Sequence, residues 1–263
     1  VRDIIKIRSV KSKVIDDKIG YVKLLQFQEK TDEELENALK GLEKDNINAL
    51  ILDLRNNPGG LLSVSIDVAS KFLPPQKLVV SVKGREEVKD KAEYFTSNNK
   101  HRLEYPMIVL VNEGSASASE IVAGALQDWE RAVVLGTTTF GKGSVQVVIP
   151  LSDGSGLKLT TSRYYTPKGR SIQVTGIVPD IVVELKVKDK KAATHPIVRE
   201  KDLKRHLENE KDKETADVEK KKEEEKSVEE VLVEISDEDD IQLQRAVDLL
   251  KSWRVFKQLP KAG

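Results

Sequence analysis

The 263-residue sequence contains no cysteine. This absence excludes disulfide bonds, thiolate catalysis and cysteine metal sites, and it leaves the redox compartment undetermined. Histidine is nearly as scarce. The three histidines, His101, His195 and His206, lie in polar surroundings without the His-x-x-x-His or Glu-x-x-His spacing of metal-binding helices. We therefore expect no metal site and no cofactor.

The sequence also lacks an excess of charge of either sign. Lys plus Arg and Asp plus Glu number 44 each, so the overall balance does not favour nucleic acid or an acidic membrane surface as a partner. Long apolar runs are missing too, because the longest, such as residues 108–111, are far too short to cross a bilayer. The only methionine is Met107 and the first residue is Val1, which indicates a processed or truncated start.

Apolar periodicity predicts strand, turn and helix units in series over about the first 185 residues. Residues 49–54 are almost continuously apolar, as is typical of a strand buried on both faces of a parallel sheet. The repeated order indicates right-handed crossovers and a largely parallel sheet. Residues 31–34 have the spacing of a capping box that opens a helix. The predicted strands are residues 14–15, 19–25, 49–54, 78–82, 107–111, 132–135, 145–149, 157–165 and 177–185, and the predicted helices are residues 31–44, 61–73 and 119–129.

The composition changes after Leu185. Residues 186–230 are dominated by Lys and Glu, as is typical of a solvated helix or a linker. Residues 239–256 then form an amphipathic helix, which we expect either to dock on the core or to pack against another copy of the chain. These changes predict a core of residues 1–186, a charged linker or helical segment of residues 187–233, and a C-terminal helical segment of residues 234–263.

Three turns of small residues follow predicted strands, at residues 59–60, 114–119 and 141–143. Because ligands of open α/β sheets bind beyond the carboxyl ends of the strands, we expect the three turns to converge. A serine at a helix N-terminus there could be a nucleophile, since unpaired backbone amides favour negative charge.

The residues alone do not choose among Ser115, Ser117 and Ser119. They favour a structural cap over a nucleophile, because Ser117 and Glu120 have the spacing of a capping box.

A serine nucleophile needs a base, and no histidine lies near any of these turns in the sequence. Lys142 is the remaining candidate, because an enclosed apolar site disfavours the charged form of lysine. The alternatives are a surface lysine in a glycine loop and a phosphate ligand, although the P-loop pattern is absent.

Four stretches together resemble the carboxy-terminal processing peptidases, also called tail-specific proteases. They occur in the family's order and spacing, with 25 positions from Ser117 to Lys142 and four from Lys142 to Gln146. The resemblance covers residues 1–185. The matching stretches are Leu52-Asp-Leu-Arg-Asn-Asn-Pro-Gly-Gly60, Val111-Asn-Glu-Gly-Ser-Ala-Ser-Ala-Ser-Glu-Ile121, Phe140-Gly-Lys-Gly-Ser-Val-Gln146 and Gly176-Ile-Val-Pro-Asp180.

This resemblance implies Ser117 as the nucleophile, Lys142 as the general base and Gln146 as the residue that orients the lysine. It implies an oxyanion hole formed by the backbone amides of Gly60 and Ala118, and it leaves Ser119 a structural residue. The implied fold is α/β, with a mainly parallel sheet of β-β-α repeats as in ClpP- and crotonase-like protease cores. A charged helical C-terminal extension follows that core.

The implied function is a serine endopeptidase that cleaves proteins near a free, apolar C-terminus, outside the cytoplasm in the periplasm or cell envelope. Terminal helices would join copies of the chain. Family members usually carry a peptide-binding PDZ module just before the segment matching residues 1–10, and we expect either a trimmed core or a PDZ-less branch.

Two alternatives stay open. The first is a latent or non-catalytic core that acts as an assembly or regulatory unit. The second is a related α/β fold that binds acyl thioesters, which would give Lys142 and Gln146 no role.

Overall fold

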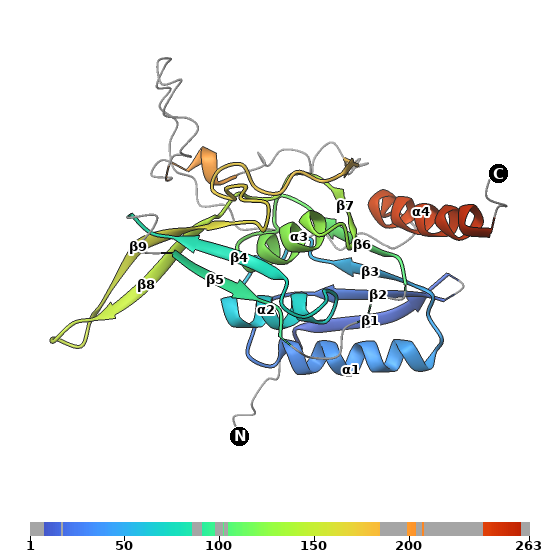
Figure 1. Cartoon of the computed structure of the whole chain (residues 1–263), viewed down its shortest axis with the longest axis horizontal. Helices are drawn as coiled ribbons and strands as arrows, with labels where there is room; N and C mark the ends of the chain where they lie inside the picture. Colours follow the sequence, from blue (N-terminus) through green and yellow to red (C-terminus); the bar gives the residue numbers. More distant parts are fainter. Residues whose placement is uncertain are drawn as a thin grey trace, which may run out of the picture.

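The computed structural model describes residues 8–16, 18–85, 91–97, 102, 105–184, 199–203, 207 and 239–258. These residues form a mixed α/β fold around a six-stranded sheet with the strand order β1-β2-β3-β6-β7-β10 (Figure 1). Only the β1–β2 pair is antiparallel in this described sheet, so the predicted largely parallel sheet is confirmed. Its strands are β1 (Val10–Ile15), β2 (Ile19–Leu24), β3 (Ala49–Asp53), β6 (Met107–Val111), β7 (Val133–Gly136) and β10 (Ile181–Val182).

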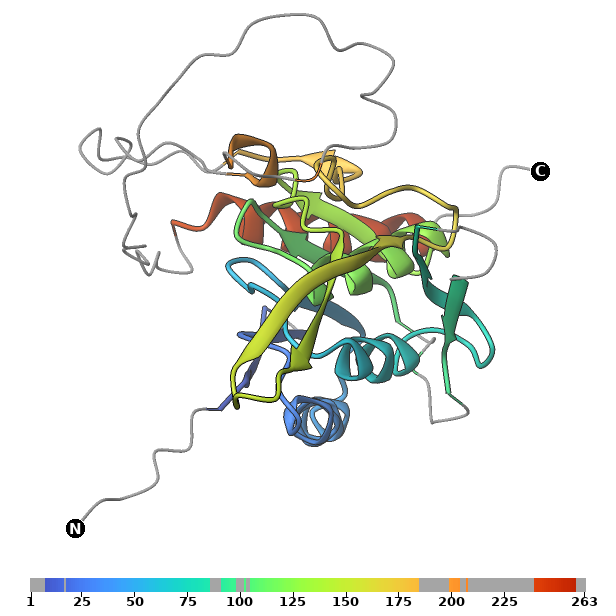
Figure 2. The same cartoon turned by 90° about the vertical axis from the view of Figure 1, so that its left-hand side faces the viewer.

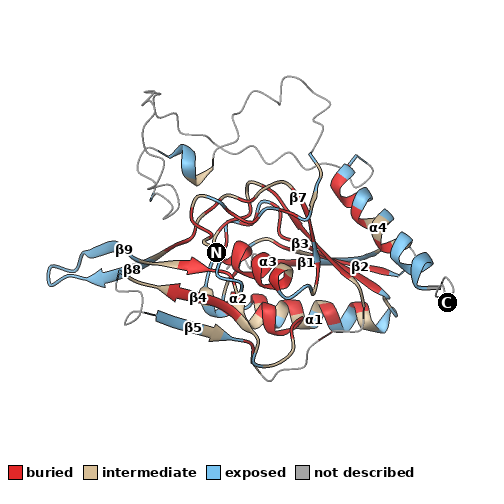
Figure 3. Ribbon diagram, turned by 45° about the horizontal axis from the view of Figure 1, so that its top comes forward, coloured by how far each residue is buried: buried red, intermediate tan, exposed pale blue. Residues whose placement is uncertain are grey.

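The continuous apolar run of β3 is explained by helices on both sides of the sheet (Figure 3). Successive side chains of a strand point to opposite faces. Leu50 and Leu52 accordingly join the apolar cluster that contains side chains of α1, α2 and α3, whereas Ala49 and Ile51 join the cluster that contains α4. The helices are α1 (Thr31–Lys44), α2 (Leu62–Ser70), α3 (Ala118–Asp128) and α4 (Ile241–Gln258).

The C-terminal helix α4 packs on the core. Leu243, Ala246 and Leu250 are buried in one cluster with side chains of β2, β3, β6 and β7. The far end of the helix is exposed (Figure 3). No helix in the described ranges is both long and apolar enough to cross a membrane.

A second, antiparallel sheet has the order β5-β4-β9-β8. Residues 78–82 were expected in the parallel core, and this prediction is wrong, because β4 pairs with β5 and β9 instead. The apolar run signals burial but carries no information about which strand lies beside it. The strands are β4 (Leu78–Lys83), β5 (Lys91–Phe95), β8 (Ser144–Pro150) and β9 (Gly156–Tyr165).

Strands β8 and β9 form a ribbon that projects from the body. Figure 1 shows it at the end of the molecule opposite to α4, and Figure 2 looks at it from that end. Its inner end begins two residues after Lys142.

The start of α1 differs from the predicted capping box. Thr31 is the first helical residue rather than the cap, and its hydroxyl accepts the Gln28 amide at 2.9 Å. The carboxylate of Glu34 instead accepts the amides of Ser9 and Val10, at 2.8 and 3.2 Å. It therefore ties the first strand to α1, a long-range contact that outweighs the local cap.

Most of the predicted charged segment, residues 187–233, lies outside the described residues. Within residues 199–203 the chain forms a short 3-10 turn, η2 (Glu200–Asp202).

Candidate active site

Ser117 lies where β6 gives way to α3, as the small-residue turn predicts. Its backbone has φ 55° and ψ −112°, a conformation that a residue other than glycine adopts only at an energetic cost. Its side chain is half-buried, whereas Ser115 and Ser119 are fully buried. The hydroxyl of Ser115 donates to the Leu54 carbonyl at 2.8 Å and that of Ser119 donates to the Asn57 carbonyl at 2.9 Å. Both flanking serines are therefore structural.

The glycine pair after β3 lies directly against the Ser117 turn. A Cβ placed on Gly59 would be 2.6 Å from the Ala116 carbonyl oxygen, 2.9 Å from the Ala118 nitrogen and 2.9 Å from the Ser117 Cβ. Gly59 also has a φ of 97°, in the region that favours glycine. Only a glycine lets the two turns approach this closely.

Two backbone amides at this junction are free of partners within the described part of the chain. The Gly60 N–H and the Ala118 N–H make none of the hydrogen bonds found there. Gly60 is held through other atoms, because its neighbours Gly59 and Leu61 form a bridge with Phe27. Free amides beside a helix N-terminus favour a negatively charged oxygen.

The third turn reaches the same place through one buried carboxylate. Glu120 accepts the amides of Ser117 and Lys142 on the same oxygen, Oε2, at 2.8 and 2.9 Å. Its other oxygen, Oε1, accepts the Thr139 hydroxyl at 2.6 Å and the Gly141 amide at 2.7 Å. Four donors therefore converge on Glu120, and they join the Ser117 turn to the Lys142 turn.

The sequence suggested only a helix cap for Glu120. The structure contains the predicted contact to the Ser117 amide, so a cap and a nucleophile do not exclude each other here. The long-range contacts to Thr139, Gly141 and Lys142 carry no signal in the local sequence. Burial raises the pKa of Glu120 to about 7, and the hydrogen bonds from Thr139 and the backbone amides oppose this rise.

Lys142 is half-buried between two glycines. Both glycines are needed for the close packing of the loop. A Cβ on Gly141 would be 2.8 Å from the Val174 carbonyl oxygen, and a Cβ on Gly143 would be 2.3 Å from the backbone nitrogen of Gln173. The buried side chain of Gln173 also accepts the Gly143 amide at 3.0 Å. The loop that carries the lysine is thus fixed on both sides.

Gln146 is not brought to Lys142 in the same way. It lies on β8 with an exposed side chain, next to a register shift between Val145 and itself. Over the residues described here, no hydrogen bond joins Gln146 to Lys142 or to Ser117. Nor, within the same ranges, do three His, Asp or Glu side chains gather as a metal site would require.

Comparisons with known proteins agree on one family. The model of peptidase family S41 matches residues 18–183. The chain is 44% identical over 255 residues to a carboxy-terminal-processing protease of Bartonella bacilliformis, an alignment that covers 95% of this chain and 56% of that protein. It is 43% identical over 187 residues to a carboxyl-terminal-processing protease of Synechocystis sp., covering 70% of this chain and 43% of that protein.

A solved structure is similar as well. The photosystem II D1 C-terminal processing protease superposes with a TM-score of 0.62 and 33% identity, covering 71% of this chain and 52% of that chain. The chain spans about half the length of the relatives named here.

Proposed function

The chain belongs to peptidase family S41, and from this premise we propose that it is a serine endopeptidase that cleaves proteins near their C-terminus. One observation carries the proposal: the Glu120 carboxylate joins the amides of Ser117 and Lys142. A hydroxyl and an amine are thereby mounted on adjoining turns, beside two unpaired amides. This is the composition that a serine acyl-transfer site requires.

In the proposed reaction the Ser117 hydroxyl attacks the substrate carbonyl carbon, and the neutral amine of Lys142 takes the hydroxyl proton. The negative oxygen of the tetrahedral intermediate accepts hydrogen bonds from the Gly60 and Ala118 amides. The peptide C–N bond then breaks, and the proton on Lys142 passes to the leaving amine. Water hydrolyses the Ser117 ester with Lys142 again as the base, which releases the acid product and restores the hydroxyl.

Gln146 is proposed to orient the Lys142 amine. Support comes from the family spacing of four positions and from the register shift next to Gln146, which interrupts the regular alternation of β8. The Gln146 side chain is exposed, so this role requires a rearrangement when substrate binds.

Three features of the proposal rest on resemblance to the family. The first is a preference for substrates with free, apolar C-termini. The second is a location outside the cytoplasm, in the periplasm or cell envelope. The third is a core with the fold of ClpP- and crotonase-like proteins. The substrate chemistry suits an acyl-transfer site that needs no cofactor.

Self-association through α4 is also proposed. Trp253 is 54% exposed and Phe256 is 69% exposed, and both line an apolar groove of about 800 Å³ between α4 and the main sheet, together with Met107 and Ile108. Large exposed aromatic side chains around a groove are typical of an interface. The occupant we propose is a second copy of the chain, through its own α4.

This assembly can be tested by adding charge. Trp253→Lys with Phe256→Lys is expected to lower the mass measured by light scattering to that of a single chain, because burying two ammonium groups would oppose association. A control with two lysines on the far ribbon, Ser155→Lys with Thr161→Lys, should keep the wild-type mass. An unchanged mass in the α4 variant would contradict the proposal.

The proposed function is tested by a serine-directed phosphonate probe on the full chain. One label per chain is expected, located on Ser117 by peptide mass spectrometry, with a rate that rises with pH because the neutral amine is the base. Labelling of Ser115 or Ser119, or no labelling beyond that of the heat-unfolded chain, would contradict the assignment.

A further inference from the structure

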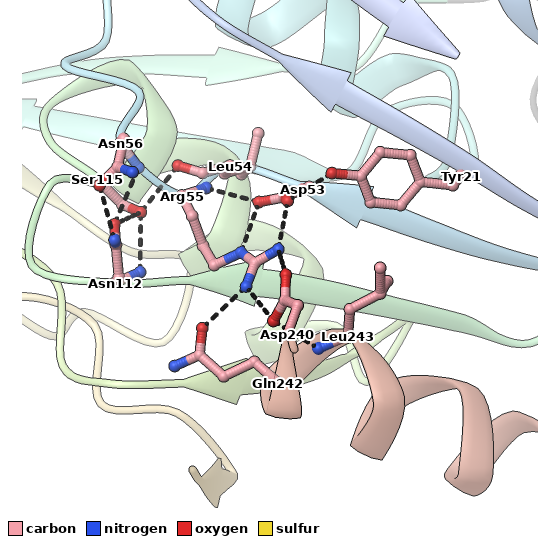
Figure 4. Close-up of polar contacts among 10 residues, drawn as sticks. All are labelled: Tyr21, Asp53, Leu54, Arg55, Asn56, Asn112, Ser115, Asp240, Gln242 and Leu243. Carbon is pink, nitrogen blue, oxygen red and sulfur yellow. Dashed lines mark hydrogen bonds and ion pairs between the residues drawn. The ribbon is translucent and has the colours of Figure 1, made fainter. Parts of the chain in front are cut away.

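The guanidinium of Arg55 is buried between two carboxylates from distant parts of the chain (Figure 4). Asp53 accepts from Nε at 3.0 Å and from Nη2 at 2.7 Å. Asp240 accepts from Nη1 at 2.8 Å and from Nη2 at 2.7 Å, across a separation of 185 residues. The side-chain oxygen of Gln242 accepts from Nη1 at 3.0 Å. The five N–H donors of the guanidinium are all used in this arrangement.

The charges in this cluster depend on one another. Burial lowers the pKa of Arg55, but Asp53 and Asp240 outweigh this effect and raise that pKa above its usual value. Burial likewise raises the pKa of Asp53, and Arg55 outweighs it, so that the pKa of Asp53 lies below its usual range. The hydroxyl of Tyr21 also donates to Asp53, at 2.7 Å. Removing one partner would leave a buried charge without compensation.

Asp240 has a second task, because it caps α4. Its Oδ1 accepts the Leu243 amide at 3.0 Å, and its backbone carbonyl accepts the Gln244 amide at 2.9 Å. Its neighbour Gln242 is fully buried and donates to the Val183 carbonyl at 2.7 Å. The start of α4 is therefore attached both to Arg55 and to the chain just after β10.

The turn that follows Arg55 is in turn joined to the turn that carries the proposed nucleophile. Asn56 has a φ of 58°. Its backbone N–H donates to Oδ1 of Asn112 at 2.8 Å, and its own Oδ1 accepts from Nδ2 of Asn112 at 2.7 Å. The Asn57 carbonyl accepts the Ala116 amide at 3.0 Å. The glycine pair follows after Pro58. A shift of Arg55 would therefore be passed to both sides of the proposed oxyanion hole.

We propose that Asp240 is a positioning residue for the proteolytic site. Through Arg55, the first turn of α4 fixes the turn that presents the Gly60 amide, so the C-terminal helix is part of the active-site scaffold. The inference rests on the proposed function, because the Gly60 amide matters to rate only if an oxyanion forms beside it. Asp240 touches no reacting atom and acts through Arg55.

The test replaces Asp240 by asparagine in the full chain. Asparagine caps helices as well as aspartate does, so α4 keeps its cap while Arg55 loses a charged, two-oxygen partner. We expect kcat to fall at least about tenfold with KM within about twofold, because an oxyanion contact acts mainly in the transition state. Active-site titration with the phosphonate probe corrects for unfolded protein. Asp248→Asn, at an exposed position of the same helix, should leave kcat unchanged.

Hydrogen exchange gives a second readout that needs no substrate. The hydrogen-bonded amides within residues 55–61, those of Arg55, Asn56, Asn57, Gly59 and Leu61, should exchange about tenfold faster in Asp240→Asn and at the wild-type rate in Asp248→Asn. Arg55→Lys keeps the positive charge but cannot bridge two carboxylates. If both residues act through the same contact, the kcat of Arg55→Lys combined with Asp240→Asn should be no lower than that of the more impaired single variant.

The two proposals fail separately. If the wild-type chain shows no labelling or turnover but exchange is faster in Asp240→Asn, the structural link would be supported and the peptidase assignment refuted. Unchanged exchange at residues 55–61, or a kcat per titrated site equal to that of Asp248→Asn, would overturn the role of Asp240.

Discussion

Replacing Lys142 by methionine is expected to slow acylation of Ser117 by about 10³-fold to 10⁴-fold, the upper range for loss of a general base. Methionine is similar in length and apolar but cannot accept a proton. The contact that holds the loop uses the Lys142 backbone amide, 2.9 Å from Glu120, so it survives any change of side chain. The variant should therefore fold normally and lose only the chemistry.

The measurement is the rate of phosphonate labelling between about pH 6 and 10. The wild-type rate should rise with pH, because only a neutral amine can act as the base, and the Lys142→Met rate should stay low and nearly flat. Lys158→Met, at an exposed position of β9, is the matched control and should behave as wild type. A Lys142→Met rate within about threefold of the control would remove lysine from the mechanism.

Much of the scaffold around these residues could be predicted from local sequence. The apolar run of β3 correctly indicated burial on both faces, and the small residues after β6 indicated a turn into a helix. These features depend on neighbours within a few positions, which is the range over which periodicity and turn chemistry carry information. The convergence of the three turns followed from strand direction alone.

The contacts that fix the site were not predictable in this way. Glu120 is joined to Gly141 and Lys142, and Arg55 to Asp240, across separations of 21, 22 and 185 residues. No local pattern distinguishes a carboxylate that will bind a distant amide or guanidinium from one that faces solvent. The wrong prediction of the sheet that contains β4 has the same origin, since the sequence of an apolar strand does not specify its neighbour. One hint was present for Asp240, because an aspartate before an amphipathic helix suggests a cap.

Glu120→Gln is expected to separate activity from stability at the centre of the site. In wild type both carboxylate oxygens accept two hydrogen bonds each. Glutamine has one oxygen and one NH₂ group, so either rotamer turns a donor toward two other donors. The bond between the turns of Ser117 and Lys142 would then be lost, or the side chain displaced. A misplacement of about 1 Å can cost about 10²-fold in rate, and we expect a fall of this size in kcat at every pH.

The effect on stability depends on pH, whereas the loss of kcat does not. Burial raises the pKa of Glu120 from 4.5 to about 7, so the folded chain binds this proton more tightly than the unfolded chain does. The resulting stabilisation is fully present below pH 4.5 and is lost as the pH rises through about 7. It amounts to about 3 kcal/mol of unfolding free energy. Glutamine does not titrate, so this part of the pH dependence should vanish in Glu120→Gln.

Urea unfolding at intervals between about pH 4.5 and 8, together with kcat at the same points, measures both effects. Glu113→Gln is the matched control, because Glu113 lies on the same turn, is half-buried and accepts only the Thr137 hydroxyl among the hydrogen bonds described. It should keep the wild-type kcat and the wild-type slope of stability against pH. If Glu120→Gln kept a full kcat, the shared carboxylate would not be what aligns the two turns. A normal slope with a reduced kcat would instead mean that the proton responsible for the pH dependence is bound elsewhere.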